Sequence, residues 1–349
     1  MAQLNSKNVI EVKDFSLSIA GKAILKDICF KISSNEIVAM VGESGSGKSL
    51  TALSLLGLLP KTKTSIESGS IQFEKTELLN FSETQWQKLR GNEISMVFQE
   101  PQSSLNPTMR CGLQVNEIIQ KHFKNSLSKE KRKEKVLEAF KRVKLPSPER
   151  IYNAYPHEIS GGQKQRVMIA MALINKPKLL IADEPTTALD VLVQKEIIDL
   201  LKELQKQTQM SVLFISHDLS LVSQLANKII VLYEGRIVES GTPKTIFKQP
   251  KDNYTRASIH ARPSPNQRLK KLPTIKNYSD PVEESEFIEP KERSIRLDKL
   301  YSQKPIFSVR NLSKIYMSKS GFFGKKESFL AVKDVSFDLY PGETLGLVG

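Results

Sequence analysis

The chain has 349 residues, of which 39% are hydrophobic, so it is long enough for more than one domain-sized core. Its formal net charge of +14 indicates an acidic partner, for which nucleotide phosphates, an anionic membrane surface and RNA are candidates. The two cysteines, Cys29 and Cys111, exclude a disulfide framework and a four-thiolate metal site built from this chain alone.

The N-terminus and the hydropathy pattern indicate where in the cell the chain is expected. Residues 1–14 lack the basic-then-apolar layout of a secretory signal. No stretch approaches the roughly 20 consecutive apolar residues that a membrane-spanning helix needs. We therefore expect a cytosolic chain without membrane spans of its own.

Residues 9–248 alternate short β-like runs with helical patterns, which predicts an α/β domain with a largely parallel sheet. The alternating run Asp27–Ile32 contains Cys29, which we interpret as a buried structural thiol. A mainly helical stretch, from Leu105 to about Tyr155, predicts an inserted subdomain; its charged part, Lys121–Lys144, favours a solvated amphipathic helix over a nucleic-acid patch. The clear strand candidates are Glu36–Val41, Ile94–Phe98, Leu179–Ala182, Val212–Ile215 and Ile229–Tyr233.

The stretch GESGSGKS, Gly42–Ser49, follows the first of these strands and fits the phosphate-binding loop pattern G-x-x-x-x-G-K-[ST] in full. Glycines let successive backbone N–H groups point at phosphate oxygens, and the helix that follows adds the positive end of its dipole. Lys48 is expected to neutralise β/γ-phosphate charge, and Ser49 to offer its hydroxyl to Mg²⁺. The expected nucleotide-binding residues of this loop are Gly42, Glu43, Ser44, Gly45, Ser46, Gly47, Lys48 and Ser49.

A second predicted helix start could also bind an anion. Ser160, Gly161, Gly162 and Gln163 open a helix whose apolar residues recur at helical spacing. One nucleotide cannot easily lie at both helix starts, which suggests that this second one binds a nucleotide held by another copy of the domain.

The run LLIADE, Leu179–Glu184, ends in two carboxylates after a buried strand, at the edge where α/β sheets bind ligands. Asp183 is expected to hold Mg²⁺, which keeps part of its hydration shell. Glu184 points differently and is expected to polarise a water for attack on the γ-phosphate.

From Gln249 to Pro305 the chain is rich in Pro and charge and lacks periodicity, which is typical of a linker. The strand-like pattern then resumes as an internal repeat. ILKDICFKI, Ile24–Ile32, matches AVKDVSFDL, Ala331–Leu339, and EIVAMVG matches ETLGLVG at the same offset.

The loop, the Ser-Gly-Gly-Gln helix start and the Asp-Glu pair, in this order, resemble the nucleotide-binding domain of ATP-binding cassette (ABC) proteins. The resemblance covers residues 9 to about 260 and resumes at Ile306. MVFQEPQSSLNP, PHEISGGQKQRVMIAMAL and IADEPTTALDVLVQ are most similar to the ATPases of bacterial dipeptide and oligopeptide importers. In those proteins a His-Pro-Tyr-Thr-Arg tail often follows, of which this chain has Tyr254–Arg256.

The resemblance implies roles for further residues. Gln99 matches the glutamine that touches Mg²⁺ and the attacking water, and Pro101–Met109 matches the stretch near the coupling helix of the membrane subunit. Asp190 matches the residue that communicates between paired sites, and His217 matches the histidine that contacts the γ-phosphate. Ile19 stands where the family has an aromatic residue that stacks on adenine.

The expected fold is therefore α/β, a P-loop NTPase of the ABC type with a helical subdomain at about 101–165. We expect an ABC domain at 9–260, a linker at 261–305 and an incomplete second ABC domain at 306–349. The expected function is ATP hydrolysis that powers an importer, most similar to those for peptides, with nickel importers as close relatives. The alternative is a soluble twin-cassette ATPase acting on ribosomes or nucleic acid.

An importer implies partners outside this chain: transmembrane permease subunits, a second cassette, and a substrate-binding protein indirectly. ATP and Mg²⁺ are the implied cofactors, with no nucleic-acid partner, and the cytoplasmic face of the cell membrane is the implied location. The last residues, Pro341–Gly349, read as the strand that leads into a second phosphate-binding loop. We therefore expect a truncated twin-cassette chain whose second copy cannot bind ATP by itself.

Overall fold

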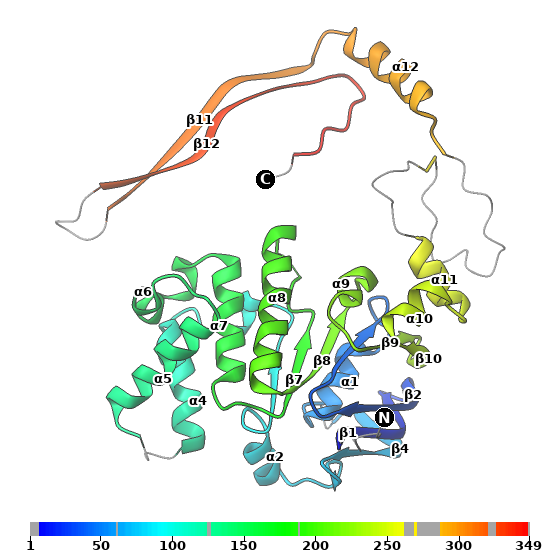
Figure 1. Ribbon diagram of the computed structural model, residues 1–349, viewed down its shortest axis with the longest axis vertical. Coiled ribbons are helices and arrows are strands. Elements are labelled where there is room, and N and C mark those ends of the chain that lie inside the picture. The colour runs from blue at the N-terminus through cyan, green and yellow to red at the C-terminus, as the bar shows by residue number, and fades with distance from the viewer. Residues whose placement is uncertain are drawn as a thin grey trace, which may run out of the picture. The chain divides into compact units, whose positions relative to one another are not determined.

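The computed structural model describes residues 7–60, 62–123, 127–187, 189–261, 269–270, 287–319 and 326–347. The chain divides into two compact units, Met1–His260 with Ile275–Ser279, and Ala261–Thr274 with Asp280–Gly349. Each unit is described by itself (Figure 1). Gly349, the expected first glycine of a second loop, lies outside the described residues.

A six-stranded sheet forms the centre of the first unit, in the order β10-β9-β3-β8-β7-β6. The strands β9, β3, β8, β7 and β6 run parallel to one another, and the edge strand β10 pairs antiparallel with β9. The strands are β3 (Ile37–Val41), β6 (Ile94–Val97), β7 (Leu179–Asp183), β8 (Ser211–Ser216), β9 (Lys228–Tyr233) and β10 (Arg236–Gly241). The five strand candidates are confirmed: four differ from the observed strand by one residue at one end, and Val212–Ile215 differs by one residue at both ends.

The sheet is covered on both faces, which explains the continuous apolar runs of its strands. Along β3, Ile37, Ala39 and Val41 belong to one apolar core, whereas Val38 and Met40 belong to the other. This alternation follows from the two-residue period of a strand.

One covering layer consists of α1 (Lys48–Leu55) and a four-stranded antiparallel sheet in the order β2-β1-β4-β5. Its strands are β1 (Asn8–Ile19), β2 (Lys22–Ser33), β4 (Thr64–Phe73) and β5 (Thr76–Glu77). The expectation that Cys29 is buried is wrong: Ile28, Phe30 and Ile32 fill the core, and the period of the strand turns Cys29 to the exposed side.

The helical insertion lies on the other side of the sheet from the antiparallel strands (Figure 1). It contains α3 (Pro101–Ser104), α4 (Cys111–Phe123), α5 (Lys129–Arg142), α6 (Pro148–Asn153) and the start of α7 (Gly161–Leu173). Helix α5 begins after Ser128, whose side chain accepts a hydrogen bond from the backbone N–H of Lys131, and buries Val136, Ala139 and Phe140. The prediction of a solvated amphipathic helix here is confirmed.

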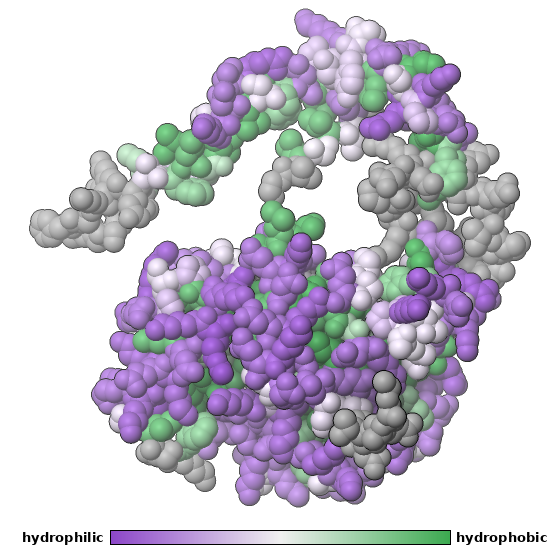
Figure 2. Space-filling model, in the orientation of Figure 1, coloured by the Kyte–Doolittle hydropathy of each residue, from purple (hydrophilic) through white to green (hydrophobic). Residues whose placement is uncertain are grey.

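The remaining helices of the first unit are α2 (Glu83–Leu89), α8 (Val191–Thr208), α9 (Leu219–Ser223), α10 (Pro243–Lys248) and α11 (Asn253–His260). The face of this unit seen in Figure 2 is mainly hydrophilic. Among the described residues, no helix has the length and apolar character to cross a membrane.

The second unit contains α12 (Pro290–Tyr301), within the segment predicted as linker, and a hairpin of β11 (Phe307–Lys319) and β12 (Lys326–Leu339). The hairpin repeats the backbone irregularities of β1 and β2. Asp14 and Asp27 have φ of 46° and 52°, and Asn311 and Asp334 have φ of 50° and 49° at the matching positions. The sequence repeat is therefore also a repeat of strand geometry.

Candidate functional site

Within the stretch Gly42–Ser49, residues 42–47 form a loop between β3 and α1, and Lys48 and Ser49 begin α1, at the carboxyl edge of the parallel strands. Gly45 and Gly47 have φ of 82° and 108°, which side-chain-bearing residues rarely adopt. A Cβ on Gly42 would lie 2.1 Å from the backbone oxygen of Leu232. Glycine is therefore required at 42 by close approach and at 47 by conformation, as the loop pattern predicts.

Lys48 lies under this loop with a residue exposure of 5%. Its ammonium donates to the carbonyl oxygens of Gly42, at 2.9 Å, and Glu43, at 2.8 Å. Burial lowers the pKa of Lys48, and the carboxylates of Glu184 and Asp183 oppose that change. The loop thus holds a buried cation at the N-terminal, positive end of α1, which favours an anionic ligand.

Asp183 ends β7 and is 4% exposed. Within the described part of the chain its Oδ1 has no hydrogen-bond partner. Burial raises the pKa of Asp183, whereas a hydrogen bond with Ser49 acts in the opposite direction. A buried carboxylate oxygen beside a serine hydroxyl fits a hard cation such as Mg²⁺, which prefers oxygen ligands.

Glu184 follows Asp183 with φ of 44°, a left-handed value that few non-glycine residues adopt. Its Oε2 accepts hydrogen bonds from the Gln99 amide at 3.1 Å and the Thr187 hydroxyl at 2.9 Å, and lies 3.2 Å from His217 Nδ1. Gln99, Glu184 and His217 follow the ends of three strands that are neighbours in the sheet, β6, β7 and β8. The structure therefore brings the three expected catalytic residues together.

Two residues that contact this site were not expected from the sequence. Thr187 is one of them, and only its position three residues after Glu184 could have indicated it. The other is Tyr254 of α11, whose hydroxyl accepts a hydrogen bond from the Glu43 backbone N–H at 3.0 Å. In the sequence, Tyr254 stands out only as part of Tyr254–Arg256, which matches the end of the His-Pro-Tyr-Thr-Arg tail of the family.

The expected second helix start is a well-formed cap on α7. Ser160 Oγ accepts from the Gln163 backbone N–H at 3.3 Å, and Gln163 Oε1 accepts from the Ser160 N–H at 3.2 Å. Gly161 lies beside Leu189, and a Cβ on Gly162 would lie 2.8 Å from Val193. These contacts tie the helix start to α8, and neither residue of the cap bonds to the loop 42–49.

Asp190 caps α8, where its Oδ1 accepts from the Val193 backbone N–H at 2.8 Å. The next two residues, Val191 and Leu192, are 79% and 76% exposed despite being large and apolar. Ile19 ends β1, where it pairs with Lys22. The structure thus assigns Asp190 a capping contact.

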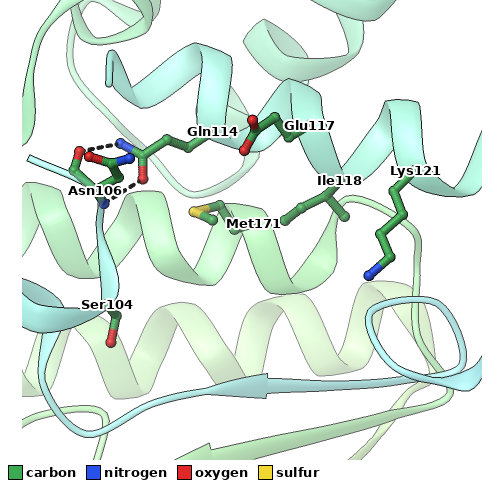
Figure 3. Close-up of a pocket in the computed structure, with 7 residues that line it drawn as sticks. All are labelled: Ser104, Asn106, Gln114, Glu117, Ile118, Lys121 and Met171. Atoms are coloured by element: carbon green, nitrogen blue, oxygen red, sulfur yellow. Dashed lines mark hydrogen bonds between the residues drawn. The ribbon is translucent and has the colours of Figure 1, made fainter. Parts of the chain in front are cut away.

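A pocket lies in the helical insertion, over the stretch expected to face a membrane subunit (Figure 3). Gln114 closes one end: its Oε1 accepts from the Asn106 N–H at 2.9 Å, and its Nε2 donates to the carbonyls of Asn106 and Met109 at 3.0 and 2.8 Å. The pocket is lined by Ser104, Asn106, Gln114, Glu117, Ile118, Lys121 and Met171.

The chain resembles known transport proteins in sequence. Residues 25–187 match the family model described as ABC transporter. An oligopeptide transport ATP-binding protein, OppD of Bacillus subtilis, is 41% identical over 310 residues, which cover 86% of each chain. A glutathione import ATP-binding protein, GsiA of Shigella boydii, is 39% identical over 99% of this chain, and the chain spans 56% of that relative.

Solved structures agree with this likeness. A dimeric post-hydrolysis form of the ATP-binding cassette MJ0796 with ADP and Pi is 28% identical, with a TM-score of 0.60 over 67% of this chain and 98% of that one. The protein cbiO1 of Clostridium perfringens, part of an ABC transporter complex, is 30% identical, with a TM-score of 0.61 over 70% of this chain and 92% of that one.

The relatives are transport proteins, so the alternative of a soluble ATPase acting on ribosomes or nucleic acid is not supported. ATP-binding subunits of this kind work as dimers and with transmembrane permease partners. The expected P-loop fold, ATP binding and ATP hydrolysis are confirmed. The chain belongs to the ATP-binding cassette family, among the ATP-hydrolysing subunits of ABC importers.

Proposed function

We propose that this chain binds MgATP at Gly42–Ser49 and uses its hydrolysis to power the import of peptides. The observation that carries the proposal is the meeting of Gln99, Glu184 and His217 around one carboxylate oxygen, at the sheet edge that bears the loop. Two relatives support the substrate class, since one is named for oligopeptides and the other for glutathione, itself a peptide.

The buried Lys48 ammonium supplies positive charge to the β- and γ-phosphates. The ammonium has three N–H donors, of which the carbonyls of Gly42 and Glu43 accept two, so the third can donate to a phosphate oxygen. Ser49, Gln99 and Asp183 would hold Mg²⁺, which neutralises charge that develops on the phosphates.

Glu184 is the proposed base. Gln99 and His217 hold its Oε2 in place. As the base it would accept a proton from the attacking water, while Gln99 orients that water and His217 the γ-phosphate. Asp183 is buried at the end of β7, whereas the Glu184 carboxylate accepts hydrogen bonds from Gln99 and Thr187, so the two carboxylates have different surroundings. Two adjacent carboxylates can therefore take different roles.

The pairing of cassettes is the proposed use of the second helix start. Ser160–Gln163 would close over ATP held by a partner cassette, since the side chains of Ser160 and Gln163 cap this start and it carries the positive end of α7. Exposed Val191 and Leu192 beside Asp190 supply an apolar surface suited to the same interface. The partner is a second cassette on another chain or in a longer form of this one.

The permease would dock over the helical insertion, at the pocket of Figure 3. Its lining includes apolar Ile118 and Met171 and charged Glu117 and Lys121. Gln99 precedes this region by five residues, so docking there can reach the catalytic cluster through a short segment. We place the chain at the inner membrane surface on this basis.

The experiment compares wild type with Glu184→Gln in cells that lack the native gene, and in purified form. We expect Glu184→Gln to lower MgATP hydrolysis by about 100-fold or more, the range of a general base, and to abolish uptake of a labelled tetrapeptide. Glu138→Gln, an exposed control on α5, should retain both. Near-wild-type hydrolysis by Glu184→Gln would refute the assigned base, and hydrolysis without peptide uptake by wild type would refute the substrate.

A further inference from the structure

Helix α11 follows the sheet in the chain and carries Tyr254. This residue contacts the phosphate-binding loop but has no role in the proposed function above. Tyr254 is 2% exposed, and its ring stacks on that of Tyr233 with centroids 4.2 Å apart. Its backbone is also held, because its N–H donates to Asp252 Oδ1 at 2.8 Å and the Asp252 N–H donates to Glu239 Oε2 at 3.1 Å. Tyr254 is thus a rigid group with a fixed hydroxyl.

The hydroxyl of Tyr254 contacts one particular peptide unit of the phosphate-binding loop. The N–H of Glu43 donates to it at 3.0 Å, and the carbonyl oxygen of the same unit, that of Gly42, accepts from Lys48 Nζ at 2.9 Å. A peptide unit is planar, so its N–H and C=O rotate together. Rotation of this unit would therefore break the contact with Tyr254 and the contact with Lys48 at once.

The surrounding backbone leaves this unit few alternatives. Gly42 lies so close to β9 that an added Cβ would be 2.1 Å from the Leu232 carbonyl oxygen. The N–H of Gly235, in the turn after β9, donates to the Ser46 carbonyl at 3.0 Å. The strand that carries Tyr233, the stacking partner of Tyr254, thus also supports the outer side of the loop.

We infer that Tyr254 is a positioning residue for ATP binding: its hydroxyl fixes the Gly42–Glu43 peptide, whose carbonyl orients the Lys48 ammonium toward the phosphate site. The inference rests on the proposed function, in that ATP binds at this loop. It concerns a residue beyond the matched range 25–187, in the last helix before the chain leaves the first unit. Burial raises the pKa of Tyr254, so its hydroxyl is neutral at physiological pH.

The test is Tyr254→Phe, which keeps the ring and removes only the hydroxyl. Binding of a fluorescent ATP analogue with Mg²⁺ to the purified chain gives the dissociation constant. We expect it to rise about fivefold, the effect of losing the hydrogen bond from the Glu43 N–H, while the protein stays folded at the assay temperature. Tyr152→Phe, a matched control on α6, should change the dissociation constant less than twofold.

A double-mutant cycle with Lys48→Met distinguishes an effect of Tyr254 on the position of Lys48 from a general effect on the folded structure. If Tyr254 acts through Lys48, Tyr254→Phe should change binding less than twofold when Lys48 is already replaced. Equal losses in both backgrounds would overturn the inference, as would wild-type affinity in Tyr254→Phe alone. The cycle remains decisive if Tyr254→Phe lowers stability, because a folding defect weakens binding in both backgrounds. Failure of wild type to bind the analogue would instead refute the proposed function.

Discussion

Replacement of Asp183 by Asn should make the nucleotide-free protein more stable while it removes the response to Mg²⁺. Asp183 is 4% exposed and, among the described residues, its Oδ1 has no hydrogen-bond partner. A buried group left unsatisfied costs about 1–3 kcal/mol, and more when it is charged. Asn keeps the shape of Asp and removes the charge, so we expect a gain of about 1 kcal/mol, at the low end because the amide stays partly unsatisfied.

The pH dependence of this gain follows from the direction of the pKa change. Burial raises the pKa of Asp183 in the folded protein, so the folded state holds its proton more strongly than the unfolded state. Ionisation then destabilises the fold, fully above the folded-state pKa and progressively less as pH falls toward the unfolded-state pKa. The advantage of Asp183→Asn should be complete at neutral pH and shrink in acid.

Thermal unfolding measures both effects. A gain of about 1 kcal/mol corresponds to an increase of about 2–4 °C in the unfolding temperature for a domain of this size. MgATP should raise the unfolding temperature of wild type and not that of Asp183→Asn, because ligand binding to the folded state stabilises it. Asp199→Asn, on the exposed side of α8, is the control and should change neither quantity. A lower unfolding temperature for Asp183→Asn, or an undiminished response to MgATP, would refute the reasoning.

Two further predictions concern packing and thiol chemistry. Gly42→Ala should lower stability by about 1–3 kcal/mol and weaken ATP binding, because its Cβ would lie 2.1 Å from the Leu232 carbonyl. Gly241→Ala, where a Cβ would meet no atom closer than 3.5 Å and the backbone is not left-handed, gives the steric comparison in chemical denaturation. Equal effects of the two substitutions would contradict the role of close approach. Burial raises the pKa of Cys111 to about 11, so at pH 8 an alkylating reagent should modify exposed Cys29 and leave Cys111 unmodified until the protein is unfolded. Mass mapping of native and unfolded samples identifies the modified cysteine. Rapid modification of Cys111 in the native protein would contradict its burial.

Part of the positive charge of the chain lies on helix α5. Lysine and arginine residues are concentrated on α5, whose apolar side packs into the core while its charged side faces solvent. The nucleotide loop needs only the buried Lys48. The basic residues of α5 therefore belong to the solvated side of a packed helix.

The elements of the first unit were predictable because their patterns are local. A strand buried on both faces requires a continuous apolar run, as in IVAMV and LLIAD, and glycines with positive φ require a Gly-rich loop. The Cys29 prediction was wrong although the signal was local: the two-residue period groups Cys29 with the charged Asp27 and Lys31, and this set faces solvent. The register of a strand, that is, which partner residues lie opposite its own, is set by tertiary packing. A shift of one residue would turn the core-facing side chains to solvent.

The sequence by itself predicted the residues of the site: the loop Gly42–Ser49 and Asp183 with Glu184 from their patterns, and Gln99 and His217 from the family resemblance. Each is specified within one strand and the turn that follows it. Only the tertiary structure decided that Gln99, Glu184 and His217 meet at one oxygen atom, and that Tyr254 holds the loop from a helix more than 200 residues away in the chain. The physical reason is that parallel strands end at a common edge, whereas the contact of α11 depends on packing between segments that no local pattern relates.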